Sequence, residues 1–167
     1  MMVPRAPHLY MAGYMVVALL AGVPSTGLAA HRPAYEWLED ERGDFVSLYY
    51  GSRDDFPGNG PFNLLCNNAE KRVFFTFVHE EGTQLGKSPS VELSAGAAKA
   101  SLTGIISPPD ETGHTFFESR VVGVKPVLAV LQTSRTLTVK LGEKSTALPD
   151  KGRAAAADQF AKACKVE

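Results

Sequence analysis

Two apolar runs joined by a short polar turn place the strongest constraint on how this chain can fold. Phe62 to Cys66 and Arg72 to Val78 are rich in aromatic and β-branched side chains, and residues 67–71 between them are mostly polar. This pattern is typical of a β-hairpin, in which turn residues separate two strand-forming segments. The sequence therefore predicts a hairpin at the centre of a small β-domain.

The only two cysteines of the chain are Cys66, at the end of the first predicted strand, and Cys164, almost at the C-terminus. An even count of two allows a single pairing, so we expect a Cys66–Cys164 disulfide in an oxidising compartment. In the loop-entropy model, a bridge that closes about 98 residues stabilises the fold by about 4 to 5 kcal/mol. The bond would tie the last segment of the chain to the central hairpin.

Residues 1–30 have the pattern of a secretory signal peptide. Arg5 supplies a positive charge, residues 11–23 form a short apolar run, and small residues follow at 27–30. We expect cleavage after Ala29 or Ala30, which leaves residues 31–167 as a single β-rich domain in the periplasm or secreted. A membrane anchor is disfavoured, because about 13 apolar residues span about 20 Å as a helix, short of a ~30 Å hydrocarbon core. No membrane span is expected after processing.

The charge balance argues against a nucleic-acid-binding protein. The chain has 17 basic and 18 acidic residues, and removing the signal peptide would take away one basic residue, Arg5. Nucleic-acid binders carry a basic face, which this composition does not supply.

The rest of the chain predicts a mainly β fold, an antiparallel sandwich or small barrel with a C-terminal α-helix and one short internal helix. About eight short strands are expected in total. The segment around Trp37 is either a short helix or a strand, with Trp37 in the core. The other predicted strands are residues 45–50, 90–95, 99–106, 115–122, 136–141 and 145–148.

Two segments predict helices. Residues 126–133 carry an apolar i, i+1, i+3, i+4 stripe after Pro126, which favours a helix over a strand. Residues 150–164 are rich in alanine, and Asp150 follows a proline, so we expect Asp150 to cap this helix. Its apolar stripe ends in Cys164, on the face that a disulfide to the sheet would require. The stripe consists of Ala156, Phe160, Ala163 and Cys164.

Nothing in the sequence indicates catalysis. His79 and His114 stand beside acidic residues, yet neither belongs to a known hydrolase motif, and the paired carboxylates are typical of solvated turns. Two thiols are too few for a structural zinc site unless histidines join them. We therefore expect no catalytic residues, no metal and no cofactor.

Two charged loops, residues 79–89 and 107–114, suggest where a partner could dock. In an antiparallel meander, loops two strands apart fall at the same end of the sheet, and loop ends are a usual place for recognition. The two loops would then form one acidic, histidine-bearing rim. A cationic or metal-bridged partner would bind it more weakly at acid pH, because the histidines gain protons. This candidate binding rim comprises His79, Glu80, Glu81, Asp110, Glu111 and His114.

The order of segments from Val127 to Cys164 resembles the closing part of invasion-associated locus B type proteins. It consists of the apolar run VLAVLQTSRTLTVKL, the step Leu148-Pro149 and the alanine-rich helix, and it covers under a third of the chain. The resemblance implies a bacterial periplasmic or surface protein with a β-rich fold and no established catalytic residues.

Together these observations predict an exported, non-enzymatic bacterial envelope protein that binds a protein or envelope component. The partner would be another envelope protein or a host-facing surface component. One alternative is a carrier of a small apolar ligand, with a cavity inside the β-domain lined by phenylalanines. An enzyme of unidentified type is a further alternative. The phenylalanines considered for that cavity are Phe74, Phe75, Phe77 and Phe117.

Overall fold

The predicted central hairpin is confirmed. Strands β3 (Phe62–Asn67) and β4 (Arg72–His79) pair antiparallel, with Leu64 opposite Phe75. The computed structural model describes residues 34–54, 60–79, 88–111 and 113–165, apart from the side chain of His79. All described residues belong to one compact unit, Arg32–Glu167.

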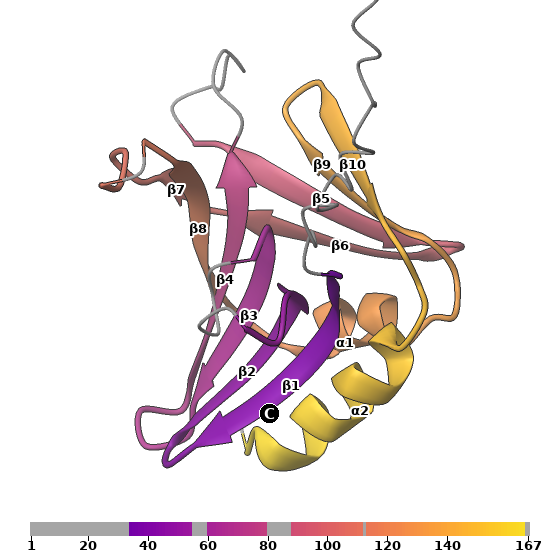
Figure 1. Cartoon of the computed structure of the whole chain (residues 1–167). Coiled ribbons are helices and arrows are strands. Elements are labelled where there is room, and N and C mark those ends of the chain that lie inside the picture. Colours follow the sequence, from indigo (N-terminus) through magenta and orange to yellow (C-terminus); the bar gives the residue numbers. More distant parts are fainter. Residues whose placement is uncertain (1–33, 55–59, 80–87, 112, 166–167) are drawn as a thin grey trace, which may run out of the picture. The chain divides into compact units, whose positions relative to one another are not determined.

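The hairpin lies in the middle of a six-stranded antiparallel sheet, here called sheet A, with the order β1-β2-β3-β4-β8-β7 (Figure 1). The segment around Trp37 is one of its edge strands rather than a helix, and Trp37 is buried as expected. The other strands of sheet A are β1 (Glu36–Arg42), β2 (Phe45–Gly51), β7 (Ile105–Ile106) and β8 (Thr115–Val121).

A second antiparallel sheet, sheet B, has four strands in the order β10-β9-β5-β6. Apolar side chains alternate with polar ones along β5, where Val91 and Leu93 are fully buried and Glu92 is exposed. Two antiparallel sheets and two helices confirm the predicted mainly β fold. The strands of sheet B are β5 (Ser90–Ala95), β6 (Ala98–Thr103), β9 (Leu137–Leu141) and β10 (Lys144–Leu148).

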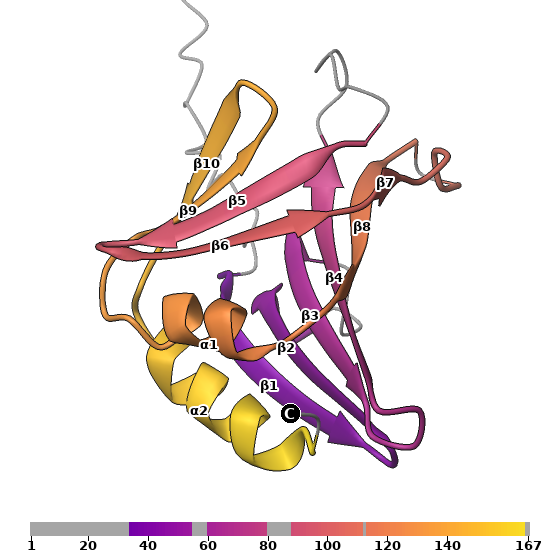
Figure 2. The same ribbon diagram turned by 180° about the vertical axis from the view of Figure 1, so that it is seen from behind.

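One segment joins the two sheets, and here the single strand predicted at residues 99–106 is wrong. The chain pairs with β5 as β6, breaks at Gly104, and then pairs with β8 as β7 (Figure 2). A Cβ atom at Gly104 would lie 2.0 Å from the carbonyl oxygen of Glu118. The backbone therefore crosses from one sheet to the other at a point where only glycine fits.

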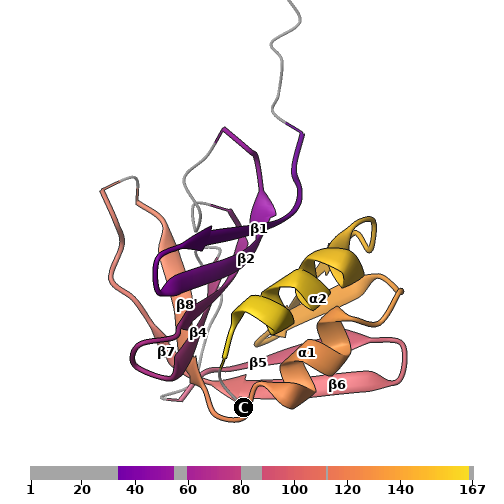
Figure 3. The ribbon, with the colours of Figure 1, turned by 90° about the horizontal axis from the view of Figure 1, so that it is seen from below.

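Helices α1 (Lys125–Leu131) and α2 (Arg153–Ala163) complete the core. Helix α1 packs on β5 and β6, α2 packs on β1 and β2, and the two helices contact each other (Figure 3). Both predicted helices are thus present, but Asp150 does not cap α2. The helix begins after Gly152, whose φ is 85°, and no side chain caps its first turn. Pro149, Asp150 and Lys151 instead belong to the connecting segment that brings Arg153 to the end of α1.

Arg153 is the one fully buried charged residue among those described, and it joins both helices to sheet A. Its Nε donates to the carbonyl oxygen of Leu131 at 3.0 Å, and its Nη2 donates to the carbonyls of Thr133 and Arg135. These carbonyls lie at and just beyond the C-terminal end of α1, where backbone acceptors lack helical partners. Burial lowers the pKa of Arg153, whereas the nearby Asp150 carboxylate acts in the opposite direction.

Trp37 links this arginine to the edge of sheet A. The guanidinium carbon of Arg153 lies 5.9 Å from the centre of the Trp37 ring, within the range of a cation–π contact. The indole Nε1 also donates to the carbonyl oxygen of Pro149 at 2.6 Å, in the segment that leads into α2. A strand, two helices and a connecting segment therefore meet around two side chains.

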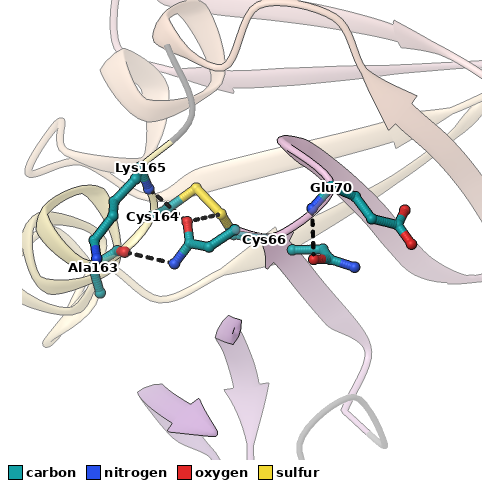
Figure 4. The surroundings of a disulfide bond; sticks show 7 residues. Cys66, Glu70, Ala163, Cys164 and Lys165 are labelled. Carbon is teal, nitrogen blue, oxygen red and sulfur yellow. Dashed lines mark hydrogen bonds between the residues drawn. A yellow bond between two sulfur atoms is a disulfide. The ribbon is translucent and has the colours of Figure 1, made fainter. Parts of the chain in front are cut away.

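The predicted disulfide between Cys66 and Cys164 is present, with an S–S distance of 2.10 Å and a Cα–Cα distance of 5.8 Å. Beside it, the side-chain amide of Asn68 donates to the carbonyl oxygen of Ala163 at 3.0 Å (Figure 4). The backbone N–H of Lys165 donates to the oxygen of the same amide at 2.7 Å. The end of β3 thus holds the end of α2 by one covalent bond, and the turn that follows β3 adds two hydrogen bonds.

Candidate functional site

The predicted rim stays a prediction, although the structure places some of its residues. Glu80 and Glu81 lie outside the described residues, and so does the side chain of His79. The backbone of His79 pairs with that of Thr115, the residue after His114. The two histidine positions are therefore at the same end of sheet A. The reason differs from the predicted meander, because β4 and β8 are neighbours only after the chain has passed through sheet B.

The second half of the rim is a turn in front of β8. Asp110, Glu111 and His114 are all exposed. The Asp110 carboxylate accepts from the backbone N–H of His114 at 2.8 Å, and the backbone N–H of Asp110 donates to the His114 carbonyl. Such bonds stabilise a solvated turn by themselves. In the part of the chain that the structure describes, no three or more His, Cys, Asp or Glu side chains lie close enough together to hold a metal ion.

The phenylalanines considered for an internal cavity do not share one face. Phe75, Phe77 and Phe117 are buried between the sheets, but Phe74 points to the opposite face of sheet A and is only partly buried. Successive residues of a strand point to opposite faces, which explains the difference. The inner rings also contact one another: the centroids of Phe62 and Phe75 are 5.1 Å apart, and those of Phe75 and Phe117 are 6.1 Å apart.

The outward faces of the two sheets differ in character. Sheet B presents polar side chains to solvent, among them Glu92, Lys99 and Lys140. Sheet A instead presents large apolar side chains on the face that turns away from sheet B and the helices, here called the outer face of sheet A. Phe45 and Ile105 are 47% and 63% exposed there. Leu38, Leu65 and Phe74 are partly buried on the same face.

A groove of about 310 Å³ opens on this face, over β4, β7 and β8. Ile105 and Phe74 give it apolar walls, and Glu118 and Arg120 add one charge of each sign. Since Ile105 pairs with Glu118 and Arg120 pairs with Phe74, the groove runs along the outward side chains of β8. Its complete lining is Phe74, Phe75, Thr76, Gly104, Ile105, Glu118, Ser119 and Arg120.

The groove has the composition of a recognition surface. Apolar side chains framed by charges are typical of a recognition surface, where the apolar centre supplies affinity and the charges set orientation. The groove side chains with hydroxyl or carboxylate groups are Thr76 on β4 and Glu118 and Ser119 on β8. Thr76 pairs directly with Glu118, whereas Ser119, the next residue along β8, points to the opposite face. The Ser119 hydroxyl donates to the Thr103 carbonyl at 2.8 Å, so it serves the junction of the two sheets.

The sequence analysis did not identify this face. A signal was present in residues 73–78, where every side chain except that of Thr76 is apolar or aromatic and the two faces do not alternate in polarity. A strand that is apolar on both faces is either buried on both or carries an exposed apolar face. The pattern alone does not separate these cases.

A comparison of the chain with protein-family models, curated proteins and solved structures finds no match. The resemblance of residues 127–164 to invasion-associated locus B type proteins therefore stays a prediction. No helix among the described residues is both long and apolar enough to cross a membrane.

Proposed function

We propose that this chain is an exported, non-enzymatic protein of the bacterial cell envelope that binds another protein through the outer face of sheet A. The observation that carries the proposal is the contrast between the two sheets. A domain with two sheets can cover both outward faces with polar side chains, as sheet B does with Glu92, Lys99 and Lys140. Exposed apolar side chains on a sheet face mark an interaction surface, and both Phe45 on β2 and Ile105 on β7 are exposed on the outer face of sheet A.

The form of the groove favours a macromolecular partner over a small ligand. Small-molecule sites bury most of the ligand in an enclosed cleft of about 300 to 1,000 Å³. The groove on sheet A is at the lower end of that range and is open to solvent along β8. Inside the domain, the rings of Trp37, Phe62 and Phe75 contact one another in sequence, which supports a packed core rather than a ligand cavity.

Export is the second part of the proposal. The predicted signal peptide and the disulfide both fit an oxidising compartment outside the cytoplasm. Mass spectrometry of the protein from the periplasmic fraction is expected to show an N-terminus at Ala30 or His31. A chain that retains Met1 and sediments with the membranes would contradict export.

Binding through the outer face of sheet A is tested by capture from an envelope extract with immobilised protein. Proteins captured by the parent are expected to be lost with Ile105→Asp, because a charge at an exposed apolar position disrupts an interface without disturbing the core. The matched control is Lys140→Asp on the outward face of sheet B, which should capture as the parent does. Equal capture by all three proteins would rule out the outer face of sheet A.

A further inference from the structure

We propose that the partner of the outer face of sheet A is a second copy of this chain, so that two molecules pack face to face. The inference rests on the proposed function only for the choice of face. It is carried by one row of side chains across that face, which is complementary to itself under two-fold symmetry.

The row crosses neighbouring strands of sheet A from β1 to β8. Register pairs Asp40 with Ser47, Ser47 with Leu65, Leu65 with Phe74, and Phe74 with Arg120. Directly paired residues point to the same face, so all of these side chains point outward. From one end to the other the row reads acidic, small, apolar, aromatic and basic.

Consider a two-fold axis that lies between the outer faces of two copies and runs parallel to β3. It places the row of one copy opposite the same row of the other copy, in reversed order. Leu65 then faces Leu65 of the partner subunit, and Phe74 lies over the partner's Ser47, a small residue that is 6% exposed between its neighbours. At both ends of the row, Asp40 faces the partner's Arg120. Every position in the row thus meets a side chain of suitable size or opposite charge, which is what an isologous interface requires.

Of the two charged residues at the ends of the row, Asp40 has an ion-pair partner among the described residues of the same molecule and Arg120 does not. Asp40 forms an ion pair with Arg42 at 2.7 Å, and its side chain keeps 30% of its area exposed. Arg120 is exposed and forms no ion pair with any residue that the structure describes. A second copy would give Arg120 a carboxylate partner.

The corresponding row of sheet B has no apolar centre, although the same two-fold would also bring its opposite charges together. Ser145, Lys140, Glu92 and Ser101 lie side by side on β10, β9, β5 and β6. Two charged residues occupy the middle of this row, where an isologous interface buries apolar side chains. The face-to-face contact is therefore assigned to sheet A alone.

A charge-swap series tests the proposal on protein purified from cells that express the full chain. Sedimentation velocity from micromolar to near-millimolar concentration is expected to show a monomer–dimer equilibrium for the parent. Arg120→Asp places two like-charge contacts in each dimer, and should weaken dimerisation by roughly tenfold or more. Combining it with Asp40→Arg restores both pairs with reversed polarity and should return the dimer to within about threefold of the parent.

Lys140→Asp makes the same change of charge on sheet B and should leave dimerisation unchanged. Thermal unfolding of each variant verifies that it is folded, which is expected because Arg120 and Lys140 are exposed and Asp40 is partly exposed. A parent that remains monomeric throughout would overturn the proposal, and so would a dimer that resists Arg120→Asp or a double variant that stays as weak as the single one.

Photo-crosslinking in the producing cells separates this inference from the proposed function. A photoreactive amino acid at Phe74 is expected to give an adduct of two copies of this chain, whereas one at Thr138 on sheet B should not. An adduct with a different protein from position 74 would contradict the second copy but retain the proposed binding face. No adduct above that from position 138 would contradict both.

Discussion

At the scale of single residues, the buried side chain of Arg153 connects α2 to the end of α1 and to Trp37 of β1. Replacing it by methionine keeps much of its volume but leaves the carbonyls of Leu131, Thr133 and Arg135 without this donor. The Thr133 carbonyl keeps the backbone N–H of Arg135 as a donor, whereas a buried acceptor such as the Leu131 carbonyl costs about 1 to 3 kcal/mol when it loses its partner. Urea unfolding of Arg153→Met is therefore expected to show a loss of about 3 kcal/mol or more.

Two further variants show whether this loss comes from the guanidinium geometry. Arg153→Lys should recover only part of the stability, because a single ammonium does not reproduce the planar fork of donors. Lys162→Met removes an exposed cation from the last turn of the same helix, and it should change stability by less than about 0.5 kcal/mol. If Arg153→Met were as mild as Lys162→Met, the arginine would not organise the junction.

The pH dependence of stability offers a test at Glu39 of β1. Its partner Leu48 is fully buried, so Glu39 is on the inward side of the edge strand. Burial raises its pKa above the usual 4.5, and the nearby Glu41 and Asp40 carboxylates add to the effect. A raised pKa means that the folded protein holds the proton more tightly. Ionisation of Glu39 therefore lowers stability as pH rises from below 4.5 toward neutrality.

Glu39→Gln is accordingly expected to melt at a higher temperature than the parent at neutral pH. The difference should shrink as the pH falls below the usual carboxyl range, where Glu39 is protonated in both states. Thermal melts of the two proteins across this range measure the difference directly. An advantage for the variant that persists unchanged in acid would show that the carboxylate charge is not its cause.

These residues also show why sequence patterns fall short at this scale. Arg153 follows Lys151 and Gly152 and precedes four alanines, a context that indicates a solvated first turn. Its burial depends on the end of α1, about twenty residues earlier in the chain. Cys66 and Cys164 were predictable as a pair because a count of two leaves one choice.

At the scale of elements, the break between β6 and β7 decides how the two sheets are joined. Gly104→Ala would place a Cβ atom against the Glu118 carbonyl and 2.8 Å from Cζ of Phe117. The strand or the ring would have to move, so we expect a loss of about 3 kcal/mol or more by chemical denaturation.

Gly43→Ala is the matched control in the turn between β1 and β2. Gly43 has a φ of 62°, and a Cβ atom added there would meet no other atom within 4 Å. The change should cost about 1 to 2 kcal/mol, from backbone strain alone. A Gly104→Ala variant no less stable than Gly43→Ala would show that the two sheets can move apart at this corner.

Alternating patterns predicted most elements but not the sheet to which each belongs. Residues 90–95 form a strand where the sequence predicts it, because polar and apolar side chains alternate there. The same alternation runs through Gly104 without a change, so it indicates one strand in place of β6 and β7. Which face of sheet A is exposed to solvent depends on where the helices pack. The sequence of residues 73–78 alone does not predict this.

At the scale of the whole molecule, the disulfide joins segments 98 residues apart in the sequence. A bridge across a loop of this length restricts the unfolded chain, and in the loop-entropy model it stabilises the fold by about 4 to 5 kcal/mol. Reduction is therefore expected to lower the melting temperature by roughly 10 °C or more. A Cys66→Ser/Cys164→Ser variant should match the reduced parent and be insensitive to reductant. Two free thiols in the unreduced parent would contradict the bond.

The same separation sets an order of events while the chain is being made. Cys66 is synthesised 98 residues ahead of Cys164, which at about 5 to 20 residues per second leaves it unpaired for roughly 5 to 20 s. No other cysteine exists in the chain, so an incorrect bond within one molecule is ruled out by composition. Every premature oxidation of Cys66 must therefore involve a different molecule. Only when α2 has been synthesised and has brought Cys164 to Cys66 is the Cys66 thiol protected from disulfide exchange with other molecules.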